Sequence, residues 1–299
     1  MELISPPRLE PGDYIGIAAP ASHFRPDALQ QGMAVLNKMG FRTRPAPALF
    51  DRQGYLAGSD ESRAADLHHL FRDPAVKGIF CARGGYGSMR LLPHLDWDLV
   101  RTHPKVFMGF SDVTVLLALF YQRSGLVTYH GPLVTELGRV SQDTQQAVVR
   151  ALASWDDIII QPARGVVVQP GAASGPLLGG NLTLFCHLLG TPFEPRVAGH
   201  LIFIEDRGEE LYRIDRMLWQ LYLAGWFDKI KGLVLGHFTD CGDMAGICEL
   251  VVGLCNRPIP VMAGFEIGHA DPNLTLPIGK QATLDTQSGT LSIHGRTPH

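Results

Sequence analysis

The first half of the chain repeats one pattern, in which a short apolar segment ends in small residues and leads into a helix. The segment YIGIAAPAS at 14–22 precedes a helical pattern at 26–41, which Gly40 closes. The pattern returns in VKGIFCARGGYG at 76–87 and in KVFMGFSDVTVLLALFYQRSG at 105–125. Apolar strands that alternate with helices form a helix-covered parallel sheet. The sequence therefore predicts an α/β fold here.

The second half has a different character. In the stretch 157–181, β-branched runs are broken by Pro and Gly, which is typical of extended strands in a connector. Helices and strands then alternate as far as two terminal strands at 282–286 and 290–295. A chain of 299 residues exceeds the usual size of one domain. We expect a first domain over 1–155, a connector over 156–178 and a smaller mixed α/β domain over 179–299.

Charge and cysteine content exclude several classes of protein. A net charge of -3 gives no basic surface for nucleic acid. The start of the chain lacks the pattern of a signal peptide, and no apolar run is long enough for a membrane span. None of the five cysteines forms a CxxC pair. Although Cys241, Cys248 and Cys255 recur at every seventh position, we interpret them as reduced thiols, and we expect no metal.

Ser111 is the first candidate for chemistry, because it follows the predicted strand at 106–109 and precedes a strongly apolar helix. In open α/β sheets, ligands bind at this carboxyl edge, where the next helix offers free N–H groups. A serine nucleophile needs a base, an acid behind that base and donors for the oxyanion. The motif GFSDV is not the G-x-S-x-G of a nucleophile elbow. A serine that merely caps a helix remains an alternative interpretation.

His269 and Glu205 are candidates for the base and the acid. His269 lies in an irregular segment, GFEIGHADPNLTLPIG, where Pro and Gly indicate a loop. It is one of 12 histidines, most of which serve other purposes. Glu205 ends the predicted strand LIFIE, beside further acidic residues that favour a solvated turn.

The glycine-rich segment ARGGYGSMR at 82–90 allows a ligand to approach the backbone closely. It lacks the spacing and the lysine of a Walker A loop, and it is not a G-x-G-x-x-G fingerprint. We interpret it as an oxyanion or substrate loop, and we expect no nucleotide cofactor.

An ordered set of motifs resembles the LD-carboxypeptidase family, which also contains microcin-immunity peptidases. The resemblance runs through nearly the whole chain. Its motifs are APAS at 19–22, RGGYG at 83–87, GFSDVT at 109–114, HGP at 130–132, GGNL at 179–182, IEDRGEELYRIDRML at 204–218 and GHADPNLTLPIG at 268–279.

The resemblance implies a flavodoxin-like N-terminal domain with a serine nucleophile and a C-terminal domain that supplies glutamate and histidine. By motif, Ser111, Glu205 and His269 would form the triad. The amides of Asp112 and Gly85 would form the oxyanion hole. The resemblance further implies a cytoplasmic homodimer that needs no cofactor. Its expected reaction is the removal of the terminal D-alanine from a murein tetrapeptide. The substrate-binding candidates in these motifs are Arg83, Gly84, Gly180 and Asn181.

Two alternatives stay open at this point. The segment between Glu205 and His269 is compact, which leaves little room for a long substrate-covering loop. The substrate is therefore less constrained than the reaction, and an immunity-type peptidase that cleaves a peptidyl or acyl adenylate is one alternative. A non-enzymatic small-ligand binder is the other.

Overall fold

The computed structural model describes residues 2–154 and 156–295. The chain forms two compact units. The first contains residues up to 154 and also 274–277, and the second contains the remaining residues from 155 onward.

The first unit is built on a six-stranded sheet in the order β12-β5-β4-β3-β1-β2. The pairs among β1 to β5 are all parallel. This order is that of a flavodoxin-like sheet, which confirms the predicted fold. The strands are β1 (Tyr14–Ala18), β2 (Arg42–Pro45), β3 (Val76–Cys81), β4 (Val106–Gly109), β5 (Thr128–His130) and β12 (Leu276–Ile278), and the helices are α1 (Pro26–Lys38), α2 (Asp60–Arg72), η1 (Ser88–His94), α3 (Trp97–Thr102), η2 (Ser111–Val113), α4 (Thr114–Ser124), η3 (Val134–Glu136) and α5 (Gln142–Ala153).

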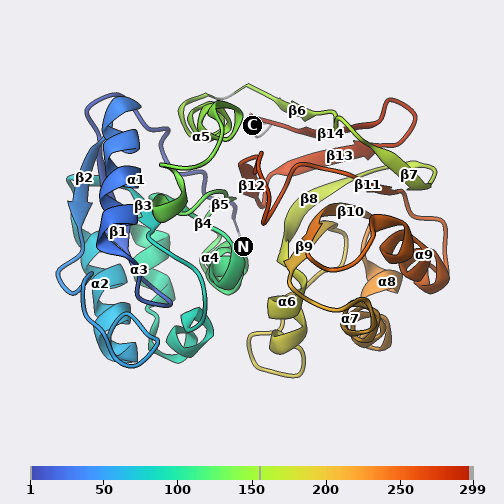
Figure 1. The fold of residues 1–299 in the computed structure, drawn as a ribbon, viewed down its shortest axis with the longest axis horizontal. Coiled ribbons are helices and arrows are strands. Elements are labelled where there is room, and N and C mark those ends of the chain that lie inside the picture. The colour runs from blue at the N-terminus through green and yellow to red at the C-terminus, as the bar shows by residue number, and fades with distance from the viewer. Residues whose placement is uncertain (1, 155, 296–299) are drawn as a thin grey trace. The chain divides into compact units, whose positions relative to one another are not determined.

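Helices cover both faces of this sheet (Figure 1). On one face, α2 packs on α3 and α3 packs on α4, while α1 contacts η3. Phe107 of β4 joins two of these helices to the sheet, because its ring lies 6.2 Å from that of Phe71 and 4.8 Å from that of Phe120. All three rings are fully buried, and each contributes roughly 2–3 kcal/mol by leaving water.

The carboxyl edge of the first sheet gathers the segments in which we expected chemistry. Strand β1 lies between β2 and β3. The chain therefore places β2 on one side of β1 and then crosses over to place β3 on the other side. Such a switch point leaves a crevice outside the carboxyl ends of the adjacent strands. The loops after β1 and β3 and the turn after β4 all lie at this edge.

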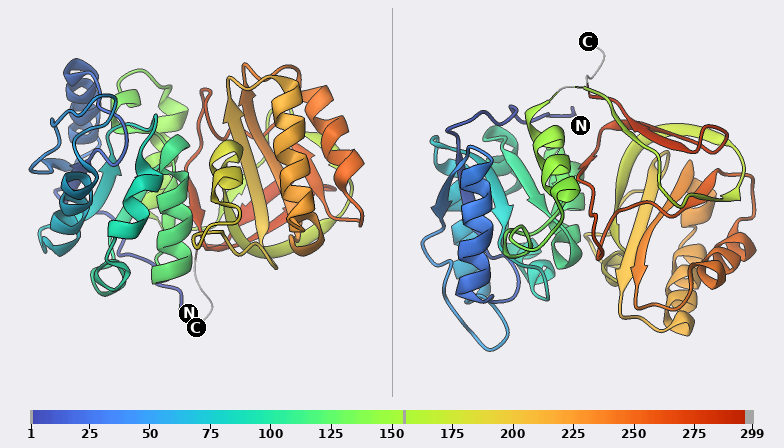
Figure 2. Two further views of the ribbon diagram at one scale, coloured as in Figure 1. Left: turned by 90° about the horizontal axis from the view of Figure 1, so that it is seen from below. Right: turned by 45° about the horizontal axis from the view of Figure 1, so that its top comes forward.

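The second unit, most of which is coloured from yellow-green to red in Figure 2, contains a mixed sheet. This sheet has eight strands in the order β6-β14-β13-β8-β9-β10-β11-β7. Strands β8 to β11 are parallel, and antiparallel strands flank them on both sides. Helix α6 packs on β8 and β9, and α7 contacts α6, α8 and α9. The elements are β6 (Ile158–Ile160), β7 (Val166–Gln169), β8 (Ala172–Asn181), α6 (Leu182–Leu188), β9 (Leu201–Arg207), α7 (Leu211–Leu223), α8 (Trp226–Lys229), β10 (Gly232–Thr239), α9 (Met244–Leu254), β11 (Val261–Ala263), β13 (Gln281–Asp285) and β14 (Thr290–Ile293).

The predicted mixed α/β character of the second part is therefore confirmed. The expected connector over 156–178 contains β6, β7 and the first residues of β8. The expected boundary at 155 falls outside the described residues. No helix in 2–154 or 156–295 has the length and apolar character that crossing a membrane requires.

Candidate active site

Ser111 lies in a strained turn at the carboxyl edge of the first sheet. Its φ angle of 62° is left-handed, which is uncommon for a residue with a side chain and often marks a functional position. The turn needs glycine at 109, because a Cβ there would lie 2.8 Å from a methyl carbon of Val113. The N-cap position of α4 is occupied by Val113. Capping of this helix therefore does not explain the serine.

The glycine loop at 83–87 lies against this serine. A Cβ on Gly84 would be 3.1 Å from Cβ and 3.2 Å from Oγ of Ser111, and 3.5 Å from the amide nitrogen of Asp112. At Gly85, φ is 96°, and a Cβ would lie 2.6 Å from Oγ of Ser22. At Gly85 the positive φ and the close contact both favour glycine, whereas a Cβ at Gly84 would require a neighbour to shift by a few tenths of an ångström. The structure brings together Ser111, Asp112 and Gly84, with Gly85 next along the loop.

Arg83 begins the glycine loop with an exposed side chain. Its Nη1 donates a hydrogen bond of 2.5 Å to the carbonyl oxygen of His23, in the loop after β1. The side chain therefore joins two loops of the carboxyl edge. An arginine has five N–H donors, so this bond leaves others for a ligand.

Glu205 and His269 form a pair in the second unit. The side chain of Glu205, near the end of β9, is fully buried, and its Oε2 lies 2.6 Å from Nδ1 of His269. A carboxylate at Nδ1 favours the tautomer whose Nδ1 carries the proton, which leaves Nε2 as a base. Close approach again requires glycine, because a Cβ on Gly268 would lie 2.4 Å from Oε2 of Glu205.

Three further side chains hold the loop that carries His269. Thr239 donates to the carbonyl oxygen of His269 at 3.0 Å, and Asn273 accepts from the amide of Gly268 at 2.9 Å. Nε2 of His237 lies 3.2 Å from the carbonyl oxygen of Pro272. Sequence reasoning missed these residues. Asn273 lies in the same motif as His269, whereas only the fold brings β10 beside that motif.

Gly180 and Asn181 lie at the end of β8, in register with Ile204 and Glu205 of β9. The side-chain amide of Asn181 makes two hydrogen bonds within the fold. Its Oδ1 accepts from the N–H of Leu184 at 3.2 Å, and its Nδ2 donates to Oδ1 of Asp206 at 3.0 Å. Asn181 thus caps α6 and joins it to β9.

Asp206 differs from its neighbour Glu205 in its partners. It is buried, and its Oδ2 accepts from both the amide and the hydroxyl of Thr183, at 2.9 and 2.8 Å. These bonds hold the beginning of α6 against β9. Of the two adjacent carboxylates, Glu205 is the one that contacts a histidine.

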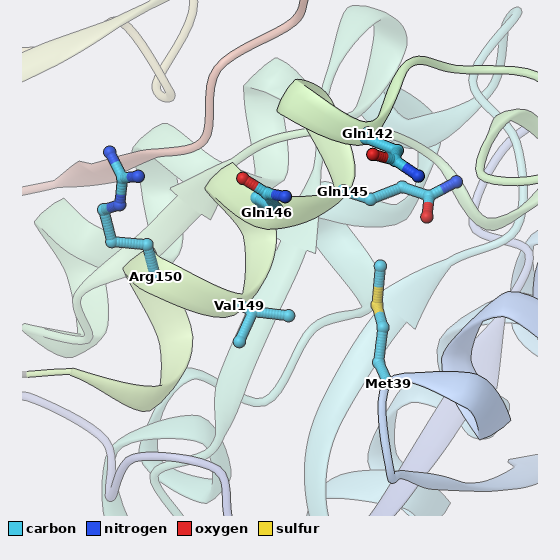
Figure 3. Close-up of a pocket in the computed structure, with 6 residues that line it drawn as sticks. All are labelled: Met39, Gln142, Gln145, Gln146, Val149 and Arg150. Carbon is cyan, nitrogen blue, oxygen red and sulfur yellow. The ribbon is translucent and has the colours of Figure 1, made fainter.

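A separate hollow of about 490 Å³ lies on the first unit between the end of α1 and helix α5 (Figure 3). Helix α1 begins after the carboxyl end of β1, so its last turn lies toward the opposite edge of the sheet from Ser111. None of the candidate site residues lines it. The lining consists of Met39, Gln142, Gln145, Gln146, Val149 and Arg150.

Comparison with protein-family models gives two matches, one for each part of the chain. Residues 15–131 match the LD-carboxypeptidase N-terminal domain. Residues 174–284 match the LD-carboxypeptidase C-terminal domain.

Curated and solved proteins resemble the chain over nearly its full length. The probable murein peptide carboxypeptidase of Bacillus subtilis is 37% identical, covering 96% of this chain and 93% of that protein. The murein tetrapeptide carboxypeptidase of Pseudomonas aeruginosa is 34% identical, covering 91% and 92%. The crystal structure of an MccF-like protein from Bacillus anthracis superposes with a TM-score of 0.91 at 29% identity, covering 97% of this chain and 99% of that one.

Proposed function

Since the chain belongs to the LD-carboxypeptidase family, we propose that it is a serine peptidase that removes the terminal D-alanine of a murein tetrapeptide by cleaving an LD-peptide bond. The observation that carries this proposal is the buried contact of 2.6 Å between Glu205 and His269. A carboxylate at Nδ1 is what a histidine needs to act as a base toward a serine. The strained turn at Ser111 supports the choice of nucleophile.

In the proposed mechanism, Oγ of Ser111 attacks the scissile carbonyl carbon while Nε2 of His269 takes the hydroxyl proton. Glu205 keeps the imidazole in the required tautomer and stabilises its charged form. The amides of Asp112 and Gly85 donate to the developing oxyanion. His269 then protonates the leaving nitrogen of D-alanine, and a water molecule hydrolyses the acyl-enzyme by the reverse proton path.

Recognition of the free carboxylate is assigned in this proposal to the glycine loop. The guanidinium of Arg83 is held at His23 and has donors left for a carboxylate. Gly84, Gly180 and Asn181 are the further substrate-binding candidates. Residues 1–155 would thus supply the nucleophile, and residues 179–299 would supply the acid and the base. The family resemblance further suggests a cytoplasmic homodimer.

Substitution of the nucleophile tests the reaction. We expect Ser111→Ala to lower kcat on a murein tetrapeptide by about 10⁴-fold or more, because residues of a triad act as a unit. Mass spectrometry of the incubated peptide measures the loss of one D-alanine. Ser174→Ala is the matched control, since this exposed serine of β8 bonds only to Thr283 in the described part of the chain. Full activity of folded Ser111→Ala protein would exclude the nucleophile.

A second substrate class is favoured by the structural comparison, because the MccF-like protein superposes at a TM-score of 0.91. An immunity-type peptidase would use the same residues on a peptidyl or acyl sulfamoyl adenylate. Parallel measurements of kcat/KM on the adenylate and on the tetrapeptide separate the two. A higher kcat/KM on the adenylate would contradict the assignment of a murein substrate, whereas the proposed serine peptidase reaction would stand.

A further inference from the structure

The glycine loop at 83–87 is hydrogen-bonded to the loop that follows β1. The amide of Ser22 donates to the carbonyl oxygen of Gly84 at 3.2 Å, and the amide of Tyr86 donates to Oγ of Ser22 at 3.1 Å. A loop rich in glycine has little conformational preference of its own. Its shape must therefore be set by contacts with other segments.

Asp112 supplies one such contact through its side chain. The residue is only 3% exposed, and its Oδ2 accepts a hydrogen bond of 2.8 Å from the amide of Ser88. Ser88 follows the glycine loop directly, and Asp112 follows Ser111 directly. A single residue therefore connects the nucleophile turn to the end of the loop, through a carboxylate that is separate from its proposed oxyanion-binding amide.

Arg63 of α2 supplies the second contact. Its side chain is 1% exposed, and its Nη1 donates to the carbonyl oxygens of Gly87, at 3.0 Å, and of Pro20. Its Nη2 pairs with Asp60, which also binds Arg90 of η1 at 2.7 Å. A buried guanidinium thus joins the glycine loop, the loop after β1 and helix α2.

The charges of these groups complement one another. Burial lowers the pKa of Arg63, whereas the negative charges of Asp60 and Asp112 favour its charged form. Charge-assisted hydrogen bonds are about twice as strong as neutral ones, so two buried charges hold the loop more firmly than neutral side chains would.

We propose that the Asp112 carboxylate and the Arg63 guanidinium are positioning groups, which together hold the amides of Gly85 and Asp112 in the geometry that binds the oxyanion. This inference rests on the proposed serine chemistry. An oxyanion hole stabilises the transition state only if its donors are fixed in advance. Hence the two side chains act on kcat without touching the substrate.

The test compares two substitutions at position 112. Asp112→Ala removes the acceptor and the charge. We expect kcat to fall about 10-fold to 100-fold, which is less than the fall caused by removing an oxyanion-hole donor altogether. We expect KM to change less than about twofold. Asp112→Asn keeps an oxygen that accepts from Ser88, so we expect it to recover part of kcat. This split between kcat and KM, with partial rescue, is not what a general loss of stability produces.

The matched control is Asp66→Asn. Asp66 is another buried carboxylate of the first unit, and its two oxygens accept from the amide of Ala48 at 3.1 and 3.2 Å. We expect its kcat to equal that of the wild type. Hydrogen exchange measured by mass spectrometry should be faster at 83–90 in Asp112→Ala and unchanged there in Asp66→Asn.

Two readouts separate this inference from the proposed function. Labelling of Ser111 by a fluorophosphonate reports on the nucleophile and the oxyanion hole without a peptide substrate. If the wild type is labelled and active while both Asp112 variants match it, the positioning role is wrong and the serine chemistry stands. If the wild type is neither labelled nor active on either substrate class, both proposals fail. If Asp112→Ala does not fold, a wild-type kcat for Asp112→Asn together with unchanged exchange at 83–90 overturns the positioning role of the Asp112 charge.

Discussion

Neighbouring atoms, and not the backbone conformation, favour glycine at position 84, because its φ angle is one that other residues also adopt. The space that a side chain would need is occupied by Ser111, whose Cβ and Oγ would both lie within 3.2 Å of an added Cβ. Contacts this short force one of the partners to move by a few tenths of an ångström. The group that must move is the proposed nucleophile or the backbone that carries it.

We therefore expect Gly84→Ala to lower kcat by about 10-fold to 100-fold, since small misplacements of reacting groups are costly. The melting temperature and kcat of the purified variant measure the effect. Gly253→Ala is the control: it lies in α9 with open space where its Cβ would be, and it should stabilise the helix by about 0.5–1 kcal/mol without a change in kcat. Wild-type kcat in Gly84→Ala would show that the loop adapts.

The acidic cluster after β9 shows what sequence can establish about the site. Order and motif single out Glu205, but its neighbours Asp206, Glu209 and Glu210 carry the same charge, and no spacing rule distinguishes them. The structure does, because Asp206 binds Thr183 and Asn181 whereas Glu205 contacts His269. Such partners come from other strands, which the local pattern does not contain.

Helix α2 carries ionisable side chains on its buried face, which is unusual for a helix that covers a sheet. Arg63 and Asp66 are buried with Leu67, Leu70 and Phe71. Each polar group holds a loop of the carboxyl edge, Arg63 at Gly87 and Asp66 at Ala48. The helix thus serves both as cover and as an anchor for loops.

Asp66 makes the stability of this unit depend on pH. Burial raises the pKa of Asp66 above its usual 3.8, with Asp51 adding to this and Ala48 and His69 opposing it. The folded protein therefore binds more protons than the unfolded chain just above pH 3.8, and stability falls there as pH rises. Asp66→Asn lacks this titrating group. As pH rises from 3.8, we therefore expect its free energy of unfolding to increase relative to that of the wild type. Urea titrations at several pH values measure this difference, and a constant difference would contradict it.

Elements with a strong local pattern were predicted well, and those without one were missed. The apolar strands β1, β3 and β4 and the helices α1 and α4 are at the expected positions. Strand β2, with the sequence RTRP, has no buried residue and depends on its pairing with β1. The helix expected after the glycine loop is instead the 3₁₀ segment η1, which contains Pro93, a residue without an amide donor.

The first sheet is not completed by the first half of the chain. Its strand β12 comes from residues 276–278, and Thr275 before it would lie 2.8 Å from a Cβ on Gly131. No local signal predicted this pairing, because LPI is a short segment whose partner β5 is far away in the sequence.

A fragment that ends at residue 154 should therefore lack one edge strand. We expect a synthetic peptide spanning 272–280 to bind this fragment and to raise its melting temperature progressively as the peptide concentration increases, because a ligand of the folded state stabilises it. A scrambled peptide of the same composition is the control, and thermal scans over a concentration series measure the shift. A fragment that melts at the same temperature with either peptide would show that β12 adds nothing to this sheet.

The late arrival of β12 also has a consequence during synthesis on the ribosome. At roughly 5–20 residues per second, about seven to thirty seconds pass between the emergence of β5 and that of β12. During this interval the nascent sheet exposes an unpaired edge, which other chains can extend. Chaperones that shield such edges should therefore affect the yield of this protein most during its translation.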